Sequence, residues 1–175
     1  MKKILINEGN LTPEEIDGTE TRVKAFLRNN SGEVLLLHNN YTYQLPGGHN
    51  LKEETLEESL IRELKEETGI DIDKNIEPFM MIREYNKNFL NTGKNVCNTI
   101  YYYDIKNDNL PNGAKLNLTE LESRTKLKFY YIKIADLEEF ILKEQKDNRI
   151  EDIIAKELLE VIKEYKLLLN GGNEE

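Results

Sequence analysis

The segment from residue 47 to residue 70 constrains the fold most, because a double glycine is followed there by a long acidic stretch without proline or glycine. Glycine permits a positive φ and lets other atoms approach the backbone closely, so Gly47 and Gly48 predict a sharp bend. Strong helix formers over residues 55–68 predict a helix, and Gly69 is a natural residue to end it. The segment therefore predicts a strand, a bend and a helix in succession.

The predicted helix has two chemically different faces. A stripe of aliphatic residues is suited to burial: Leu56, Leu60, Ile61 and Leu64. Glu63, Glu66 and Glu67 stand three and four residues apart, so we expect their carboxylates to converge on another face. A partly buried cluster of this kind takes up protons or binds cations, and hard oxygen ligands suit Mg²⁺ or Mn²⁺ better than zinc. The charges alone equally allow a solvated acidic face.

The full spacing distinguishes between these two interpretations. The fixed positions are Gly48, Glu54, Arg62-Glu63, Glu66-Glu67, Gly69 and Ile70. The segment from Gly48 to Ile70 resembles the Nudix box at every one of them, which is a far more specific signal than a short glycine motif. The resemblance implies hydrolysis of a diphosphate linkage in a small nucleotide, either a nucleoside diphosphate linked to another group or a nucleoside triphosphate.

The resemblance also implies roles for individual residues. Glu63, Glu66 and Glu67 would hold Mg²⁺ or Mn²⁺, with a backbone carbonyl of Gly47 or Gly48 as a further ligand. Ions held there would neutralise diphosphate oxygens and acidify a water molecule, and one of the three glutamates or a later carboxylate would accept the proton. Many family members supply another acidic ligand from a loop before the last strand. The candidates for it are Glu120 and Glu122, of which Glu122 is preferred.

Arg62 is interpreted mainly as a supporting residue. It precedes the acidic cluster by one position, so we expect it to point away from the metal face and to pair with Glu54, which would fix the loop after the glycines against the helix. The alternative is direct contact with phosphate, so the expected substrate-binding residues are Tyr43, Gly48 and Arg62. Gly69 is expected to have a structural role only.

The flanking sequence agrees with an α/β fold. Alternating and aliphatic runs predict strands at residues 2–6, 21–28, 33–38, 41–45, 76–85, 95–105 and 126–134, and helices follow at about 135–143 and 150–169. This order predicts an α/β/α sandwich with a mixed sheet and a C-terminal amphipathic helix, as in Nudix domains. We expect one domain over residues 1–175, with the motif at 48–70 and the C-terminal helices at about 135–169.

Charge and composition limit the partners. A formal net charge of −9 argues against duplex nucleic acid, whose binding depends on lysine and arginine. The apolar runs are too short for a membrane span or a signal peptide, and the single Cys97 suits a reducing cytoplasm. The amphipathic last helix leaves a homodimer open.

Two functions rival the hydrolase. A non-catalytic Nudix domain that binds or senses a nucleotide metabolite is the first, although the acids that such relatives usually lose are all present here. An isomerase-type relative acting on a prenyl diphosphate is the second, and we find no second site in the sequence to support it.

Overall fold

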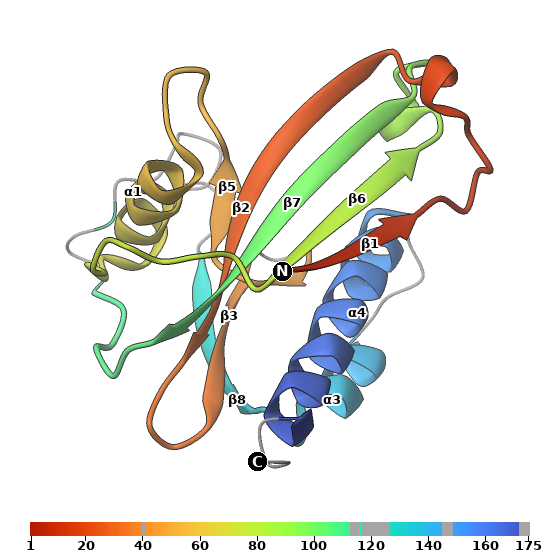
Figure 1. The fold of residues 1–175 in the computed structure, drawn as a ribbon. Helices are drawn as coiled ribbons and strands as arrows, with labels where there is room; N and C mark the ends of the chain where they lie inside the picture. Colours follow the sequence, from red (N-terminus) through yellow and green to blue (C-terminus); the bar gives the residue numbers. More distant parts are fainter. Residues whose placement is uncertain (40, 113–115, 117–126, 145–148, 172–175) are drawn as a thin grey trace.

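The computed structural model describes residues 1–39, 41–112, 116, 127–144 and 149–171 (Figure 1). The elements in chain order are β1 (Lys2–Ile6), η1 (Pro13–Glu15), β2 (Gly18–Arg28), β3 (Glu33–His38), β4 (Tyr43–Gln44), β5 (Gly47–His49), α1 (Leu56–Thr68), β6 (Met80–Asn86), η2 (Phe89–Asn91), β7 (Val96–Lys106), β8 (Lys128–Lys133), α3 (Leu137–Glu144) and α4 (Arg149–Gly171).

The strands form one mixed sheet in the order β1-β6-β7-β2-β3-β4, with β5 added to β2 and β8 added to β3. The pairs β1–β6 and β2–β7 are parallel and the others are antiparallel. β2 and β7 pair along eleven residues each, so these two long strands form the centre of the sheet (Figure 1). β5 pairs with the middle of β2, and the chain continues from β5 towards α1.

Each face of the sheet has its own apolar core. α1 covers one face, where Leu60 and Leu64 pack with the β2 residues Val23, Ala25 and Leu27. α3 and α4 cover the other face, as Figure 1 shows, and their cluster includes β2, β6 and β7 side chains. Burying two faces of one sheet requires helices on both sides. The expected α/β/α sandwich with a mixed sheet and a C-terminal amphipathic helix is confirmed.

β2 begins earlier than predicted, at Gly18, and β4 is shorter, covering only Tyr43–Gln44. Two further stretches also differ from the prediction. β6 begins at Met80, so residues 76–79 precede the strand, although Ile76 and Phe79 do contribute to the apolar clusters. Residues 47–49, expected as a bend alone, form β5 against β2. In both cases the partner strand decides where pairing begins, and this information is not local to the segment.

Two further features concern the setting of the protein. Cys97 is a buried free thiol, and the expected cytoplasmic location stays a prediction. Among the described residues, none of the helices combines the length and the apolar composition that crossing a membrane requires.

Candidate active site

α1 has well-defined ends because its terminal residues satisfy backbone groups that a helix leaves open. Thr55 accepts a hydrogen bond from the Glu58 backbone N–H at 3.2 Å, and the Glu58 carboxylate accepts one from the Thr55 N–H at 2.9 Å. Gly69 ends the helix in the left-handed conformation, with φ 70°. The sequence signals for the start and the end of this helix are therefore met by the structure.

The double glycine is required by close contacts on both of its sides. Gly47 has φ 137°, and a Cβ there would lie 2.1 Å from the backbone oxygen of Val23 on β2. A Cβ on Gly48 would lie 2.5 Å from the carboxyl atoms of Glu63. Both distances are below van der Waals contact, so position 47 requires glycine against the β2 backbone, and a side chain at position 48 would displace the Glu63 carboxylate.

The acidic residues of α1 meet this bend. The buried Glu67 carboxylate accepts a hydrogen bond from the Gly47 N–H at 2.7 Å, and the Glu63 carboxylate lies against Gly48. Glu66 is joined to Glu63 through one atom, because Nη1 of Arg62 donates to both carboxylates at 2.9 and 2.8 Å. All three glutamates thus lie on the side of α1 that faces the bend, where the guanidinium of Arg62 contacts two of them.

Arg62 connects the helix to the loop that precedes it. Its guanidinium makes a forked pair with Glu54, with Nε–Oε1 at 2.7 Å and Nη2–Oε2 at 3.0 Å, and Nη2 also donates to the His49 carbonyl at 3.0 Å. The hydrogen bond from Arg62 lowers the pKa of Glu54. The expected contact with Glu54 is present, and its role as a support stays a prediction.

The expectation that Arg62 points away from Glu63 and Glu66 is wrong. One residue along a helix turns the Cβ direction by about 100°, but the arginine side chain is long enough to return to the neighbouring face. Its Nη1 therefore lies between the two carboxylates and compensates their charge.

The fit of a divalent cation follows from these contacts. In the described residues, no three His, Cys, Asp or Glu side chains are arranged so that they hold a metal ion together. The donor chemistry nevertheless suits one: carboxylate oxygens meet at a bend whose glycines leave room for close approach, and a cation, Nη1 of Arg62, already lies between Glu63 and Glu66. Glu63, Glu66 and Glu67 are the residues that would hold Mg²⁺ or Mn²⁺.

Comparison with known proteins identifies the family. The family model of the NUDIX domain matches residues 18–156. The chain belongs to the Nudix family. This makes it a Nudix-type pyrophosphohydrolase, the class of enzyme that the motif predicts. A sequence comparison with curated proteins gives no significant match.

Solved structures agree on the fold of this Nudix chain. An Ap4A hydrolase from C. elegans, solved as a binary complex, superimposes with a TM-score of 0.56 at 17% identity, covering 87% of this chain and 98% of that one. A MutT protein from Methanosarcina mazei Go1 gives a TM-score of 0.52 at 21% identity, covering 89% and 99%. At these identities the likeness concerns the fold.

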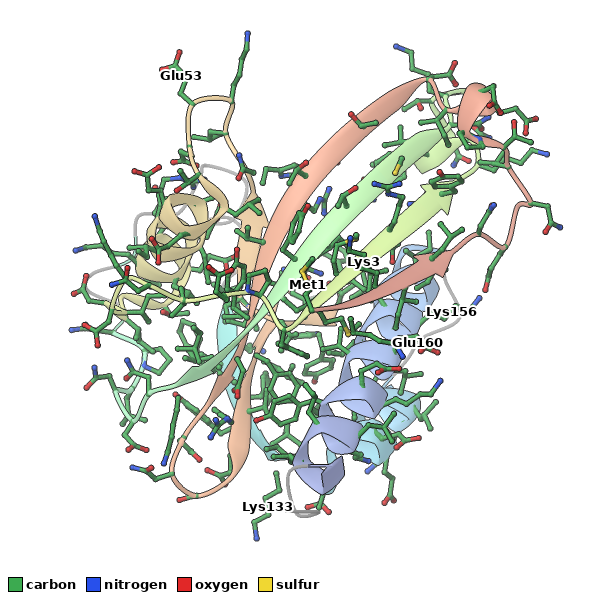
Figure 2. All side chains as sticks on the ribbon, in the orientation of Figure 1. Met1, Lys3, Glu53, Lys133, Lys156 and Glu160 are labelled. Atoms are coloured by element: carbon green, nitrogen blue, oxygen red, sulfur yellow. The ribbon has the colours of Figure 1, made fainter. Side chains whose placement is uncertain are left out.

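The other expected site residues of the Nudix chain lie elsewhere. Tyr43 is in an aromatic cluster with Tyr130 and Phe140, with ring centroids 5.3 and 5.0 Å away, on the α3 side of the sheet. The cavity beside Tyr43 has a volume of only about 20 Å³, which is room for about one water molecule. Glu120 and Glu122 fall outside the described residues. Glu53, expected as solvated surface, is exposed in the loop between β5 and α1 and points away from the sheet (Figure 2).

Sequence reasoning missed several charged residues on the α4 face. Lys24 Nζ lies 2.6 Å from Glu157 Oε1, and the Tyr102 hydroxyl donates to the same oxygen. A signal was available in the last helix, because Glu157 is four residues from both Ile153 and Val161 and so interrupts an apolar stripe. An acidic residue at such a position is buried and needs a partner, and Lys24 on β2 provides it.

Proposed function

We propose that this Nudix chain hydrolyses a diphosphate linkage in a small nucleotide, with Mg²⁺ or Mn²⁺ held by Glu63, Glu66 and Glu67. The observation that carries the proposal is the contact of two of these carboxylates with the glycine bend, Glu63 at Gly48 and Glu67 at the Gly47 N–H. The remaining ligands in the proposal are those expected from the sequence: a backbone carbonyl of Gly47 and the carboxylate of Glu122.

The side chains have distinct tasks in this proposal. Bound divalent ions neutralise phosphate oxygens and lower the pKa of water. Glu67 is fixed by the Gly47 N–H, so it orients the bend and the helix relative to each other. Arg62 holds Glu54, Glu63 and Glu66 in one arrangement, which limits the motion of the ligands before the substrate arrives. One of the glutamates accepts the proton of the attacking water.

The substrate class is supported by the family and by the charge of the chain. The similar solved structures include an Ap4A hydrolase, whose name denotes a nucleotide substrate. A net charge of −9 is unfavourable for duplex DNA or RNA, whereas a small diphosphate that arrives with divalent cations is not repelled. We include in the proposal a single domain over residues 1–175.

The test is the substitution Glu66→Gln, with Glu53→Gln as the matched control. Both variants replace one carboxylate by an amide, but Glu66 contacts Arg62 at the site while Glu53 lies exposed in the preceding loop. Phosphate release from a panel of nucleotides with Mg²⁺ or Mn²⁺ is measured. We expect kcat to fall by roughly 100-fold or more in Glu66→Gln and to stay within about twofold in Glu53→Gln.

The same panel distinguishes the rival function. Undiminished turnover by Glu66→Gln would remove the metal assignment. Absence of turnover in the unmodified protein on every nucleotide, together with tight nucleotide binding, would favour the sensing domain over the hydrolase.

A further inference from the structure

β1 forms one edge of the sheet. It pairs with β6 on one side, and within the described ranges no strand lies along its other side (Figure 1). Its five residues, Lys2–Ile6, include neither proline nor glycine. The strand also lies outside residues 18–156, the part of the chain that the Nudix family model matches. β1 therefore adds to the matched part of the chain a sheet edge that is able to accept a further strand.

The backbone groups that face outward belong to Lys3 and Leu5. The Lys2 N–H donates to the carbonyl of Phe79, just before β6, at 2.9 Å, so Lys2 directs its backbone groups inward. Alternate residues of a strand direct their N–H and C=O groups to opposite edges, so Ile4 also faces β6. Lys3 and Leu5 then present their N–H and C=O groups to the outer edge, where a further strand is able to bind them.

The side chains along β1 have opposite charges at its two ends. Lys2 and Lys3 are exposed at the start, where Figure 2 labels Lys3, and the Glu8 side chain is 68% exposed just after the end. Between them, Leu5 is an apolar side chain that is 58% exposed. Lysines on an edge strand normally oppose pairing with other chains. In an antiparallel arrangement of two copies, however, the lysines of each lie towards the glutamate of the other.

We propose that β1 pairs with β1 of a second copy of this chain, antiparallel about a two-fold axis at Ile4. Lys3 exchanges both backbone hydrogen bonds with Leu5 of the partner subunit, and the reverse pair does the same. Lys2 lies opposite Ile6 of the partner subunit, where the partner's Glu8 is a diagonal neighbour within reach of a long side chain. The two-fold axis closes the assembly as a dimer with one continuous sheet. The proposal is independent of the proposed function.

Other registers are less favourable. Placing Lys3 opposite its own copy brings like charges together, which is destabilising. Placing Leu5 opposite its own copy extends the pairing to Asn7, which lies beyond β1 and whose side chain already bonds the Leu11 backbone at 2.8 and 2.9 Å. A shift by one residue sets Lys3 and Leu5 against residues whose backbone groups face β6. The register centred on Ile4 avoids all three problems.

α4 leaves room for the second copy. One flank of the helix follows β1, where Lys156 reaches Glu8 at 2.8 Å. Its buried side extends to β2, where Tyr165 stacks on Phe26 with ring centroids 4.1 Å apart, and β6 and β7 lie between β1 and β2. The helix axis therefore lies over the inner strands, so the two copies of α4 are roughly 15–20 Å apart, beyond the distance of about 8–10 Å for directly packed helices. The flanks that carry Lys156 and Glu160 face each other across the axis (Figure 2).

The first test is Leu5→Pro, which removes an outward N–H. Proline is tolerated in an edge strand where its nitrogen faces solvent. Leu110→Pro is the matched control, because Leu110 is 75% exposed in the loop after β7. Sedimentation velocity in about 0.15 M salt, which screens repulsion between chains of net charge −9, measures the mass. We expect the unmodified protein and Leu110→Pro to be mainly dimeric at about 200 µM and monomeric at about 1 µM, as suits a small interface, and Leu5→Pro to be monomeric throughout.

The register is tested by Ile4→Cys, with Lys2→Cys as its matched control. At the axis, Ile4 meets its own copy in a non-hydrogen-bonded pair with Cα atoms about 4.5 Å apart, within the range of a disulfide. Lys2 lies opposite Ile6, so it stands roughly 14 Å from its own copy. With oxidised glutathione we expect a covalent dimer for Ile4→Cys and none for Lys2→Cys on a non-reducing gel. The buried Cys97 is common to both variants.

Thermal unfolding checks that each variant is folded. An unmodified protein that stays monomeric at about 200 µM would overturn the proposal, as would a folded Leu5→Pro that still forms dimers, since these would use another surface. If Leu5→Pro does not fold, the two cysteine variants decide, and equal crosslinking in both or crosslinking in neither would overturn the proposal. None of these measurements involves hydrolysis, so the proposed function is tested separately.

Discussion

Two groups of charged side chains lie on opposite sides of β2, and they differ in their access to water. At the glycine bend, the Arg62 side chain is 25% exposed and Glu66 is 31% exposed. Beneath α4, Lys24 is 8% exposed and Glu157 is 6% exposed. Partly exposed charges are able to exchange one partner for another, whereas buried charges depend on a fixed partner. The comparison indicates that the first group is suited to binding ions and the second to holding α4 on the sheet.

The pKa shifts in the two regions have opposite signs. A hydrogen bond from Arg62 lowers the pKa of Glu54 near the bend. Burial raises the pKa of Glu84 to about 7 on the α4 face. The same type of side chain is therefore held as an anion in one region and titrates near neutral pH in the other.

The largest expected effect comes from breaking the buried pair. Lys24→Met leaves the buried Glu157 of α4 with the Tyr102 hydroxyl as its one remaining hydrogen-bond partner among the described residues. We expect the free energy of unfolding to fall by about 3–5 kcal/mol, because an unpaired buried charge is costly. Urea unfolding followed by circular dichroism measures it.

An exposed ion pair is the control for that substitution. Lys65 and Asp71 lie 2.7 Å apart with side chains 61% and 64% exposed. We expect Asp71→Asn to change the free energy of unfolding by no more than about 0.5 kcal/mol. A similar loss in both variants would mean that burial does not distinguish the two pairs.

The next effect concerns the pH dependence of stability. Glu84 has a raised pKa of about 7 in the folded chain, compared with its ordinary value of 4.5, so its stabilising contribution is complete below about pH 4.5 and is lost as the pH rises through 7. We expect the free energy of unfolding to fall over this range by about 3 kcal/mol more in the unmodified protein than in Glu84→Gln.

Glu54 affects the pH dependence of the free energy of unfolding in the opposite direction. Its pKa is lowered in the folded chain, so its contribution is present at neutral pH and is lost as the pH falls through the folded-state pKa. We therefore expect the free energy of unfolding of Glu54→Gln to fall less on acidification than that of the unmodified protein. If the free energy of unfolding had the same pH dependence in the unmodified protein, Glu84→Gln and Glu54→Gln, the environments of Glu84 and Glu54 would not differ in the way described.

The smallest expected effect is on catalysis. Arg62→Lys keeps the charge but loses the forked pair with Glu54 and the shared contact with Glu63 and Glu66. We expect kcat to fall by about 10- to 100-fold with little change in KM, because the ligands are less well oriented. Steady-state kinetics at saturating Mg²⁺ measures both. A rise in KM alone would instead make Arg62 a substrate-binding residue.

The sequence predicts α1 and its surroundings well because the signals there are local. Thr55 and Gly69 act on backbone groups within one turn of themselves, and the spacing of Glu63, Glu66 and Glu67 fixes their face of the helix. The motif extends this success to the bend, where the glycines permit contacts that a Cβ would block.

The remainder depends on partners far apart in the chain. The pairing of Lys24 with Glu157 joins residues 133 positions apart, and no local pattern specifies it. The reach of Arg62 around α1 depends on a rotamer that follows from where Glu54 lies. β6 starts at Met80 rather than Ile76 because its residue-by-residue pairing with β1 and β7 begins at Met80. Such features are set by tertiary packing.

The long pairing of β2 with β7 has a consequence for synthesis on the ribosome. Residues 18–28 find their parallel neighbours only at residues 96–106, and the glycine bend and α1 lie between them. Contacts this distant in sequence form slowly because a large loop must close first. While the chain is being made, the acidic helix therefore emerges well before the sheet that will support it is complete.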